Sequence, residues 1–378
     1  MANYKSVLFE QMIKEFAEKE VKPLAQEVDE QERFPVETVE KMAKAGLFGI
    51  IVPTQYGGAG GDYHMYISAV EELSKHCATT GVILSGHTSL CVAPILEFGT
   101  EEQRQKYLPD LASGKAIGAF GLTEPNAGTD ASNQQTVAIE KEDHYLLNGT
   151  KIFITNAGYA STYIIIAVTG KGPKGPEMSA FIVESGYEGF SVGKKEKKMG
   201  IRGSSTCELI FENVKVPKEN ILGKRGDGFK IAMKTLDGGR VGIAAQALGI
   251  AEGALDATIA YVKSRKQFGK PLSAFQNTQF VLADLSTKIT AAKLLVNAAT
   301  EAKQNKLPTL SVSAAQAKLF ASETAMEVTT KCVQLHGGYG YTREYPVERM
   351  MRDAKITEIY EGTSEVQRMV ISSALLRK

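Results

Sequence analysis

The chain has 378 residues, of which 43% are hydrophobic and 23% are charged, a balance typical of globular proteins that bury a sizeable core. Its 44 basic and 43 acidic side chains leave a formal net charge of +1, which gives no reason to expect binding to nucleic acid or to an anionic membrane. The four cysteines are far apart and form no CxxC pair, so we expect free thiols in a reducing compartment.

Neither a metal centre nor a membrane segment is expected. The five histidines form no HExxH motif and no close cluster with cysteines. No apolar run approaches the ~18 residues of a membrane-spanning helix. Residues 1–20 are typical of an acidic helix and not of a signal or transit peptide. We therefore expect a cytoplasmic protein.

The first region, residues 1–117, is expected to be helical. Apolar residues recur at three- and four-residue steps from Val7 to Leu24. Further helices are expected at 64–79, 81–98 and 101–113. A glycine-rich loop interrupts this pattern at 52–63, and Asp62 near its end is placed to cap the next helix.

The second region, residues 118–225, changes period. Short runs such as TYIIIAV and CELIFENVKV are rich in β-branched and aromatic residues and are separated by Gly, Asn, Pro and Lys. This pattern predicts a small antiparallel β domain. Within it, Asn148-Gly149 is a favourable pair for a hairpin turn.

The third region, residues 226–378, returns to long helices that together predict a bundle. These helices are expected at 226–264, 275–304 and 309–335. Small residues such as Gly249 and Gly253 recur along the first of them, which predicts close packing against a neighbouring helix. The order is thus helix, β, helix, and no doubly wound nucleotide fold is expected.

Common catalytic motifs are absent from the sequence. It contains no Walker A loop and no GxSxG elbow. The glycine clusters at 57–61, 223–228 and 337–340 do not complete GxGxxG after a strand, which disfavours a Rossmann dinucleotide site.

Four other segments could contact a phosphate or a ring, although each also has a plain structural interpretation. GLTEPNAGTD at 121–130 could wrap an anion with backbone N–H groups or form a surface turn. KIFITNAG at 151–158 could be an edge strand. The cations of SRKQFGKPL at 264–272 suit a helix C-terminus as well as a phosphate. QLHGGYGYTREYP at 334–346 is a glycine turn after a helix, and its His336 has no acid or nucleophile nearby in the sequence.

The segment IYEGTSE at 359–365 places Glu361 between an aromatic residue and a glycine. The following Thr363 and Ser364 are typical of a helix N-cap. Local chemistry leaves two interpretations of Glu361 open, a reactive carboxylate or a solvated acid beside a turn.

Taken in order, these segments resemble the acyl-CoA dehydrogenase family over nearly the whole chain. KMGIRGSSTCELIFENVKVP, SRKQFGKPLSAFQ and MRDAKITEIYEGTSEVQR extend the resemblance, and TLDGGRVGIAAQALGIA is similar to short-chain, butyryl-type members. The resemblance implies an α+β chain with an N-terminal all-α domain at 1–117, a central antiparallel β domain at 118–225 and a C-terminal four-helix bundle at 226–378. It also implies non-covalent FAD and a homotetramer built as a dimer of dimers.

The implied activity is the FAD-dependent α,β-dehydrogenation of a short-chain acyl-CoA to the trans-2-enoyl-CoA, as in the β-oxidation of fatty acids. Electrons would pass to an electron-transferring flavoprotein. The alternatives are a dehydrogenase for branched-chain or other acyl groups, an acyl-CoA oxidase that uses oxygen, and a catalytically silent helical binding protein on the same fold.

The resemblance implies cofactor contacts from five segments. Those of the first loop are Phe120, Leu122, Thr123, Gly128 and Thr129, and those of the following strand are Phe153, Ile154 and Thr155. Contacts to the FAD of a partner subunit are Arg265, Gln267, Phe268 and Gln276, with Gln334, Leu335, His336, Gly337 and Gly338 on its adenosine side. Thr363, Ser364 and Glu365 would cap FAD. Two positions depart from the common pattern, because Thr129 stands where Ser is frequent and Phe153 where many members have Trp.

The resemblance assigns the catalytic base to Glu361, which would remove the α-proton of the thioester. The implied substrate contacts are Thr129, Asp237, Arg240 and Gly362. Some branches of the family carry the base at the position of Gly239, and here that position has no carboxylate. An apolar, water-poor surrounding would raise the pKa of Glu361 and make it a stronger base.

Overall fold

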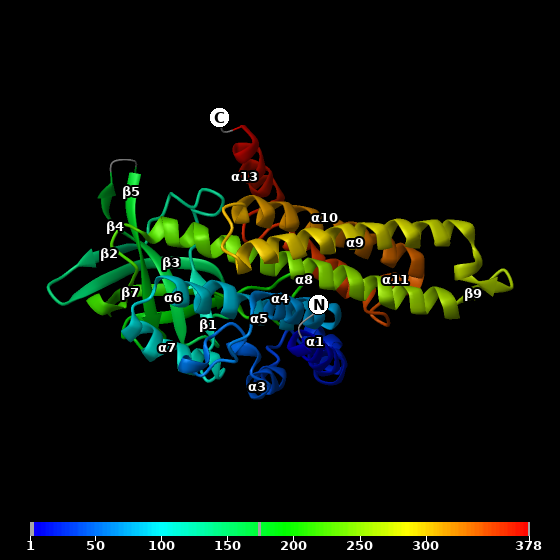
Figure 1. The fold of residues 1–378 in the computed structure, drawn as a ribbon, viewed down its shortest axis with the longest axis horizontal. Helices are drawn as coiled ribbons and strands as arrows, with labels where there is room; N and C mark the ends of the chain where they lie inside the picture. Colours follow the sequence, from blue (N-terminus) through cyan, green and yellow to red (C-terminus); the bar gives the residue numbers. More distant parts are fainter. Residues whose placement is uncertain (1–3, 173–174, 377–378) are drawn as a thin grey trace.

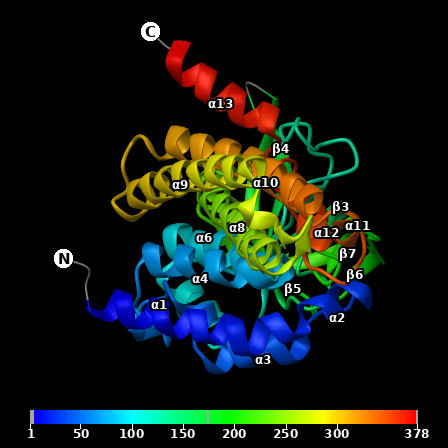
Figure 2. The same cartoon turned by 90° about the vertical axis from the view of Figure 1, so that its right-hand side faces the viewer.

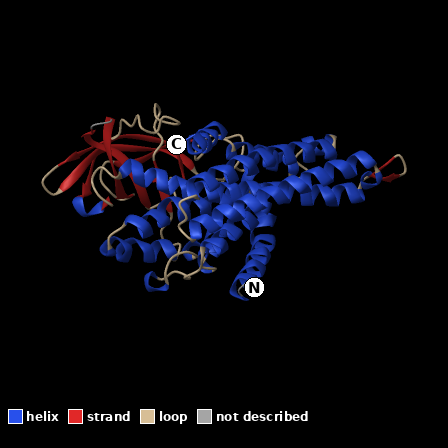
Figure 3. Cartoon of the chain, turned by 45° about the horizontal axis from the view of Figure 1, so that its top comes forward, coloured by secondary structure: helices blue, strands red, loops and turns tan. Residues whose placement is uncertain are grey.

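The computed structural model describes residues 4–172 and 175–376. A β-sheet lies at one end of an elongated molecule, and the longest helices extend from it to the other end (Figure 1). Figure 3 shows that the main strands gather at one end, whereas a short β-hairpin forms the opposite tip. The predicted order of helix, β and helix is confirmed.

The N-terminal part is helical, and its helices lie along one side of the C-terminal bundle (Figure 2). Its elements are α1 (Tyr4–Phe16), η1 (Ala17–Val21), η2 (Lys22–Leu24), α2 (Ala25–Glu30), α3 (Val36–Lys44), η3 (Leu47–Gly49), η4 (Thr54–Tyr56), α4 (Tyr63–His76), α5 (Ala78–His87), η5 (Thr88–Val92), α6 (Ala93–Phe98) and α7 (Glu101–Ala112). Asp62 caps α4 as predicted, since its carboxylate accepts from the N–H of Met65 at 2.8 Å.

The helix expected at 81–98 is interrupted by one π-helical turn. The N–H of Ala93 donates to the carbonyl of Thr88, five residues back. The next residue, Pro94, has no N–H to donate, so the regular ladder cannot continue through it. The segment is therefore α5, the π-turn η5 and α6 instead of one uniform helix.

The sheet has the strand order β6-β7-β3-β2-β4-β5-β8, with β1 beside β4. Its strands are β1 (Gly118–Gly121), β2 (Val137–Glu140), β3 (His144–Thr155), β4 (Thr162–Gly172), β5 (Gly175–Glu184), β6 (Phe190–Lys195), β7 (Thr206–Pro217) and β8 (Ile221–Leu222). The antiparallel prediction is correct for most neighbours but wrong for β1 with β4 and β2 with β4, which are parallel. A parallel neighbour needs a crossover instead of a tight turn, and the long segment from β1 to β4 provides it.

The prediction of a hairpin turn at Asn148-Gly149 is wrong. Both residues lie inside β3, where the pairing with β7 shifts between Leu147 and Gly149. Gly149 has φ 145°, and a Cβ there would crowd Thr136 at 2.6 Å. The glycine therefore serves a bulge in a long strand, because pairing over the length of β7 overrides the local turn preference.

The C-terminal part contains three long helices that lie side by side (Figures 1 and 2). Its elements are α8 (Gly228–Ser264), β9 (Lys266–Gln267), β10 (Lys270–Pro271), η7 (Leu272–Ala274), α9 (Gln276–Gln304), α10 (Leu310–His336), α11 (Gly338–Tyr341), α12 (Val347–Thr357) and α13 (Ser364–Leu376). The shorter α12 packs against α8 and α10 as the fourth member of the bundle, and α13 packs on α10. The three long helices match their predicted ranges to within a few residues.

Close packing along α8 is also confirmed. A Cβ added to Gly249 would overlap the carbonyl of Glu71, and one added to Gly253 would overlap the carbonyl of Lys75. The two glycines thus let the backbones of α4 and α8 approach each other, which joins the N-terminal helices firmly to the bundle.

Two helical stretches, Ala78–Phe98 and Gly228–Ser264, are long and apolar enough to cross a membrane by length and composition alone. Of their most apolar windows, 78% and 67% respectively are buried inside the fold. Helices that are apolar on most faces also form the cores of large soluble proteins, and these two occupy that position here.

Candidate active site

A cavity of about 660 Å³ opens where the end of the sheet meets the bundle. It brings together residues from β1, β3, α8 and the turn before α13. The predicted site residues that line it are Phe120, Leu122, Thr123, Gly128, Thr129, Phe153, Ile154, Thr155, Arg240, Glu361, Gly362 and Thr363. Leu90, Met233 and Leu236 form an apolar part of the wall that sequence reasoning missed, because apolar residues on helices carry no sign of which face lines a cavity.

The loop at 121–130 is held from beneath by a buried ion pair. Lys151 of β3 is fully buried and its Nζ lies 2.6 Å from Oε1 of Glu124 in that loop. The same ammonium donates to the carbonyl of Leu122 at 3.1 Å. Glu124 also accepts from the N–H groups of Gln135 at 2.6 Å and Thr136 at 3.0 Å. The two motifs that sequence analysis treated separately are therefore one unit.

The end of β3 turns one aromatic ring outward. Its pairing with β7 shifts between Lys151 and Ile154, and Phe153 between them has φ 58°. A bulge re-aims a side chain in this way. The Phe153 side chain lines the cavity and is 59% exposed, whereas Ile154 is buried. The strand thus presents the Phe153 ring to the cavity, while the buried Ile154 next to it anchors the strand.

Glu361 lies at a strained corner. It has φ 54°, a left-handed conformation that costs a non-glycine residue about 1 kcal/mol, and Gly362 follows with φ 94°. The side chain of Thr363 then accepts from the N–H of Val366 at 3.3 Å, which confirms the predicted N-cap of α13. The residue as a whole is half-buried, but its Oε2 is buried and has no hydrogen-bond partner among the residues described.

Burial raises the pKa of Glu361 to about 7, and the charges of Lys318 and Arg240 act in the opposite direction. A carboxylate with a pKa near neutrality is a competent general base. Gly239 provides the space for it, because a Cβ there would overlap Oε2 of Glu361. The interpretation of Glu361 as a solvated acid is therefore wrong.

Asp237 and Arg240 form a pair on α8. The Arg240 guanidinium donates to Oδ1 of Asp237 at 2.7 Å, and its buried Nε has no partner among the residues described. Arg240 lines the cavity whereas Asp237 does not. Asp237 thus orients Arg240 and does not itself face the cavity.

A second network, also missed from the sequence, fixes the wall at 196–201. Oδ1 of the buried Asp353 accepts from the N–H of Ile201 at 2.5 Å, and Ile201 has φ 42°. Burial raises the pKa of Asp353 to about 6. The neighbouring Arg352 donates to Oδ2 of Asp29 at 2.6 Å. The wall is therefore tied to both helical parts of the chain.

The other predicted cofactor contacts lie far from this cavity, at the opposite end of the long helices (Figure 1). They are Arg265, Gln267, Phe268, Gln276, Gln334, Leu335, His336, Gly337 and Gly338. Arg240 and Arg265 are both on or at the end of α8, about 25 residues and thus roughly 37 Å apart at 1.5 Å per residue. Phe268 is 93% exposed. His336 is buried, and its ring stacks on that of Tyr261 with the ring centroids 4.2 Å apart. Of the three residues predicted to cap FAD, Thr363 lines the cavity, whereas Ser364 and Glu365, which follow it in the sequence, do not line it.

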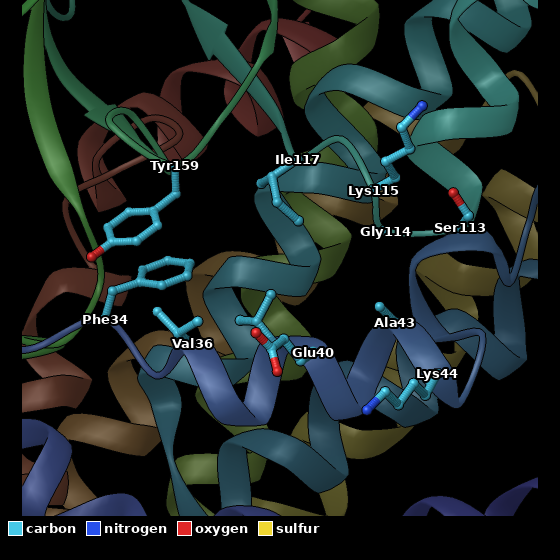
Figure 4. Close-up of a pocket in the computed structure, with 11 residues that line it drawn as sticks. Phe34, Val36, Glu40, Ala43, Lys44, Ser113, Gly114, Lys115, Ile117 and Tyr159 are labelled. Atoms are coloured by element: carbon cyan, nitrogen blue, oxygen red, sulfur yellow. The ribbon is translucent and has the colours of Figure 1, made fainter.

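A second hollow of about 460 Å³ lies between α3 and the 113–117 segment (Figure 4). Stacked rings of Phe34 and Tyr159, 3.8 Å apart, form one side of it. It contains none of the predicted site residues. Among residues 4–172 and 175–376, no group of three or more His, Cys, Asp or Glu side chains is placed to hold a metal ion.

Comparison with known proteins gives the context for this arrangement. The family descriptions "Acyl-CoA dehydrogenase, N-terminal domain", "middle domain" and "C-terminal domain" match residues 5–115, 119–214 and 226–376. The chain is 63% identical to "Acyl-CoA dehydrogenase, short-chain specific" of Clostridium acetobutylicum, over 98% of this chain and 97% of that protein.

The chain belongs to the acyl-CoA dehydrogenase family.

Solved structures of this family superimpose closely on the chain. Butyryl-CoA dehydrogenase from Megasphaera elsdenii has a TM-score of 0.97 at 53% identity and covers 100% of this chain and 99% of its own. A chain described under "Electron transferring flavoprotein of Acidaminococcus fermentans: Towards a mechanism of flavin-based electron bifurcation" has a TM-score of 0.97 at 56% identity, with coverage of 100% and 99%.

As an acyl-CoA dehydrogenase, the protein is a FAD-dependent oxidoreductase. A Bacillus anthracis family member complexed with FAD has a TM-score of 0.93 at 35% identity and covers 100% of this chain and 67% of its own. The cavity fits such a group, because its size, its aromatic wall at Phe153 and the open space around Gly128, where a Cβ would meet no atom within 4 Å, all admit a large planar cofactor.

Proposed function

We propose that the protein dehydrogenates a short-chain acyl-CoA to the trans-2-enoyl-CoA, with Glu361 as the base. The observation that carries this proposal is the carboxylate itself, which is buried, has no hydrogen-bond partner among the residues described and lies in the wall of the cofactor-sized cavity. Such a group can accept a carbon-bound proton without first losing a hydrogen bond.

The residues of the chain would act as follows. Glu361 takes the α-proton of the thioester onto its carboxylate, and its burial keeps the proton affinity high. The backbone N–H of Glu361 donates to no acceptor among the residues described, so it is free to stabilise the developing enolate oxygen. Bound FAD would supply the acceptor for the β-hydrogen, which leaves as hydride. Phe120, Leu122, Thr123, Gly128, Thr129, Phe153, Ile154, Thr155 and Thr363 would hold that cofactor.

The acyl group would lie against Leu90, Met233 and Leu236, which provide an apolar wall next to the base. Arg240 and Gly362 would contact the substrate from the same side, whereas we assign Asp237 to the support of Arg240. A short-chain substrate is supported by the relatives from Clostridium and Megasphaera, which are described as specific for short chains or butyryl-CoA. Electron-transferring flavoprotein is the proposed acceptor, in keeping with the Acidaminococcus structure.

We also propose that the protein is a cytoplasmic homotetramer, built as a dimer of dimers. The predicted cofactor contacts at the end of the long helices opposite the cavity, from Arg265 to Gln276 and from Gln334 to Gly338, would touch the FAD of a neighbouring subunit. The exposure of Arg265, Gln267 and Phe268 supports this assignment, because none of the three lines the cofactor-sized cavity of its own chain. The domain limits 1–117, 118–225 and 226–378 remain part of the proposal.

The test is an anaerobic titration with acyl-CoAs of graded length, followed by bleaching of the flavin absorbance. Wild-type enzyme should bleach fastest with butyryl-CoA. Glu361→Gln should keep its FAD and bind substrate but lose bleaching by about 10⁴-fold, the upper range for removal of a general base. Bleaching of Glu361→Gln at the wild-type rate would remove Glu361 from the mechanism. Turnover with oxygen as fast as with electron-transferring flavoprotein would favour an oxidase.

A further inference from the structure

A buried cation lies beneath the corner that carries the base. Lys318, on α10, is fully buried, and its Nζ donates to the carbonyl of Gly362 at 2.7 Å. Lysine is seldom buried completely, because removing an ammonium from water costs several kcal/mol unless the surroundings compensate. The mechanism proposed above does not use this residue, so its position calls for a physical reason.

The carbonyl that Lys318 binds belongs to the strained corner. The same oxygen of Gly362 also accepts from Nε2 of the buried Gln367 at 2.8 Å. It is therefore held from both sides, by α10 and by α13. Glu361 has a left-handed φ, which a non-glycine residue keeps only where the surroundings determine it. The two donors hold the carbonyl of the next residue and thus contribute to fixing this corner.

Charge is the second contribution of Lys318. Burial lowers the pKa of Lys318 to about 8, and the charge of Glu361 is the main opposing influence. The ammonium therefore remains protonated at pH 7. The other charged groups that face Lys318 are Arg240 from α8, Glu358 from the end of α12 and Glu365 from α13.

The pKa of Glu361 depends in turn on the charge of Lys318. Lys318 and Arg240 are the cations that oppose the effect of burial on its pKa. Its remaining titratable neighbours are the hydroxyl groups of Tyr63 and Tyr66 on α4 and of the adjacent Tyr360. These phenols are neutral near pH 7, so Lys318 and Arg240 are the cations that stabilise the ionised base.

We propose that Lys318 is a positioning residue of the active site, which fixes the Glu361 corner through the Gly362 carbonyl and keeps a positive charge beside the base. This inference rests on the proposed function, because it assigns a role to Lys318 only if Glu361 is the base. It predicts two separable effects, one on the geometry of the corner and one on the ionisation of Glu361.

Two variants separate these effects. Lys318→Met removes both the hydrogen bond and the charge, whereas Gln367→Met removes a hydrogen bond to the same carbonyl oxygen and leaves the charge. Lys318→Met should lower kcat about 100-fold, as expected for misplacement of a catalytic group, and should move the acidic limb of the pH profile upward by about one unit. Gln367→Met should lower kcat less and leave the limb in place. KM should change little in both.

Two further variants control for packing. Thr329→Val alters a buried residue of the same helix, which bonds only within α10, and should move neither kcat nor the pH profile. Lys318→Arg keeps the charge and should keep the limb at its wild-type position. If Lys318→Met does not fold, Lys318→Gln replaces it, because it can still donate to the carbonyl but carries no charge.

An independent readout is the infrared band of the protonated carboxyl group that disappears in Glu361→Gln. Its titration midpoint should rise in Lys318→Met and stay constant in Lys318→Arg. An unchanged midpoint and an unchanged pH limb in Lys318→Met would overturn the proposal. Activity of Glu361→Gln would instead overturn the proposed function, so the two failures are distinguishable.

Discussion

Both ends of the α8–α10 bundle carry predicted cofactor contacts, but the two ends differ in how the chain completes them. At the sheet end, residues from β1, β3, α8 and the turn before α13 enclose a cavity of about 660 Å³. At the hairpin end, Arg265, Gln267 and Gln334 are exposed. A sequence motif therefore does not by itself show that one chain forms a complete binding site. The chain can bind the ligand alone only where the fold brings the side chains of several motifs together around one cavity.

The largest effect is expected at the sheet end, from Lys151→Met. This change leaves Glu124 as a buried carboxylate without its cation, which typically costs 3–5 kcal/mol of stability, and it frees the 121–130 loop. The purified protein should contain little FAD at any protein concentration, as measured by its flavin absorbance. Chemical denaturation measures the loss of stability. The double variant Lys151→Met/Glu124→Gln should recover part of the stability. Full FAD content in the single variant would contradict a supporting role for this pair.

At the hairpin end, Arg265→Ala/Gln334→Ala should weaken FAD binding about 100-fold through the loss of two polar contacts. Because both side chains are exposed in the single chain, the melting temperature of the apoprotein should not change. Fluorescence titration of the apoprotein with FAD measures the effect.

A mixing experiment sharpens this comparison further. Glu361→Gln has an intact hairpin end but no base, whereas Arg265→Ala/Gln334→Ala has an intact base. The FAD concentration is kept too low to load Arg265→Ala/Gln334→Ala, so that neither variant is active alone. If the two ends meet across a two-fold interface, co-refolding the two variants should then restore roughly a quarter of wild-type activity, since half of the dimers are mixed and each has one complete site. No recovery on mixing would show that each chain uses only its own residues.

Within the sheet end, Gly239→Ala tests the space in front of the base. The added Cβ would overlap Oε2 of Glu361 and also crowd Leu90, so the carboxylate must swing away. The expected result is a roughly 10- to 100-fold lower kcat with FAD content unchanged. Gly186→Ala is the matched control, because a Cβ there meets no atom within 4 Å. Equal kcat values in the two variants would show that the carboxylate does not need this position.

The comparison also shows which features could be predicted from the sequence. Long helices such as α8 were found to within a few residues, because apolar spacing and small residues act over many turns. The bulge at Gly149 was mistaken for a turn, since the pairing of β3 with β7 depends on residues about 60 positions away. The burial of Lys318 and its bond to Gly362, 44 residues later, likewise leaves no local signal. Sequence motifs named the parts of the site, and the tertiary contacts that hold them had to come from the structure.

The smallest effect is expected between the two ends, where Glu71 of α4 is buried against α8 and α9. Burial, assisted by the charge of Glu252, raises the pKa of Glu71 to about 7, and Lys293 at 2.5 Å opposes this shift. The folded state therefore holds this proton more tightly than the unfolded state, whose carboxyl has an ordinary pKa of about 4.3.

It follows that this group lowers the stability of the wild-type protein as pH rises from about 4.5 to 7, and that the penalty is complete above that range. Glu71→Gln should be nearly neutral at pH 4, where the Glu71 carboxyl group is protonated in the folded state, and should stabilise the protein by about 1 kcal/mol at pH 8, with part of the gain offset by the lost bond to Lys293. Urea denaturation at the two pH values measures the difference. FAD content and kcat should stay unchanged, because Glu71 lines neither end. A loss of stability at pH 8 would mean that the bond to Lys293 outweighs the burial of the charge.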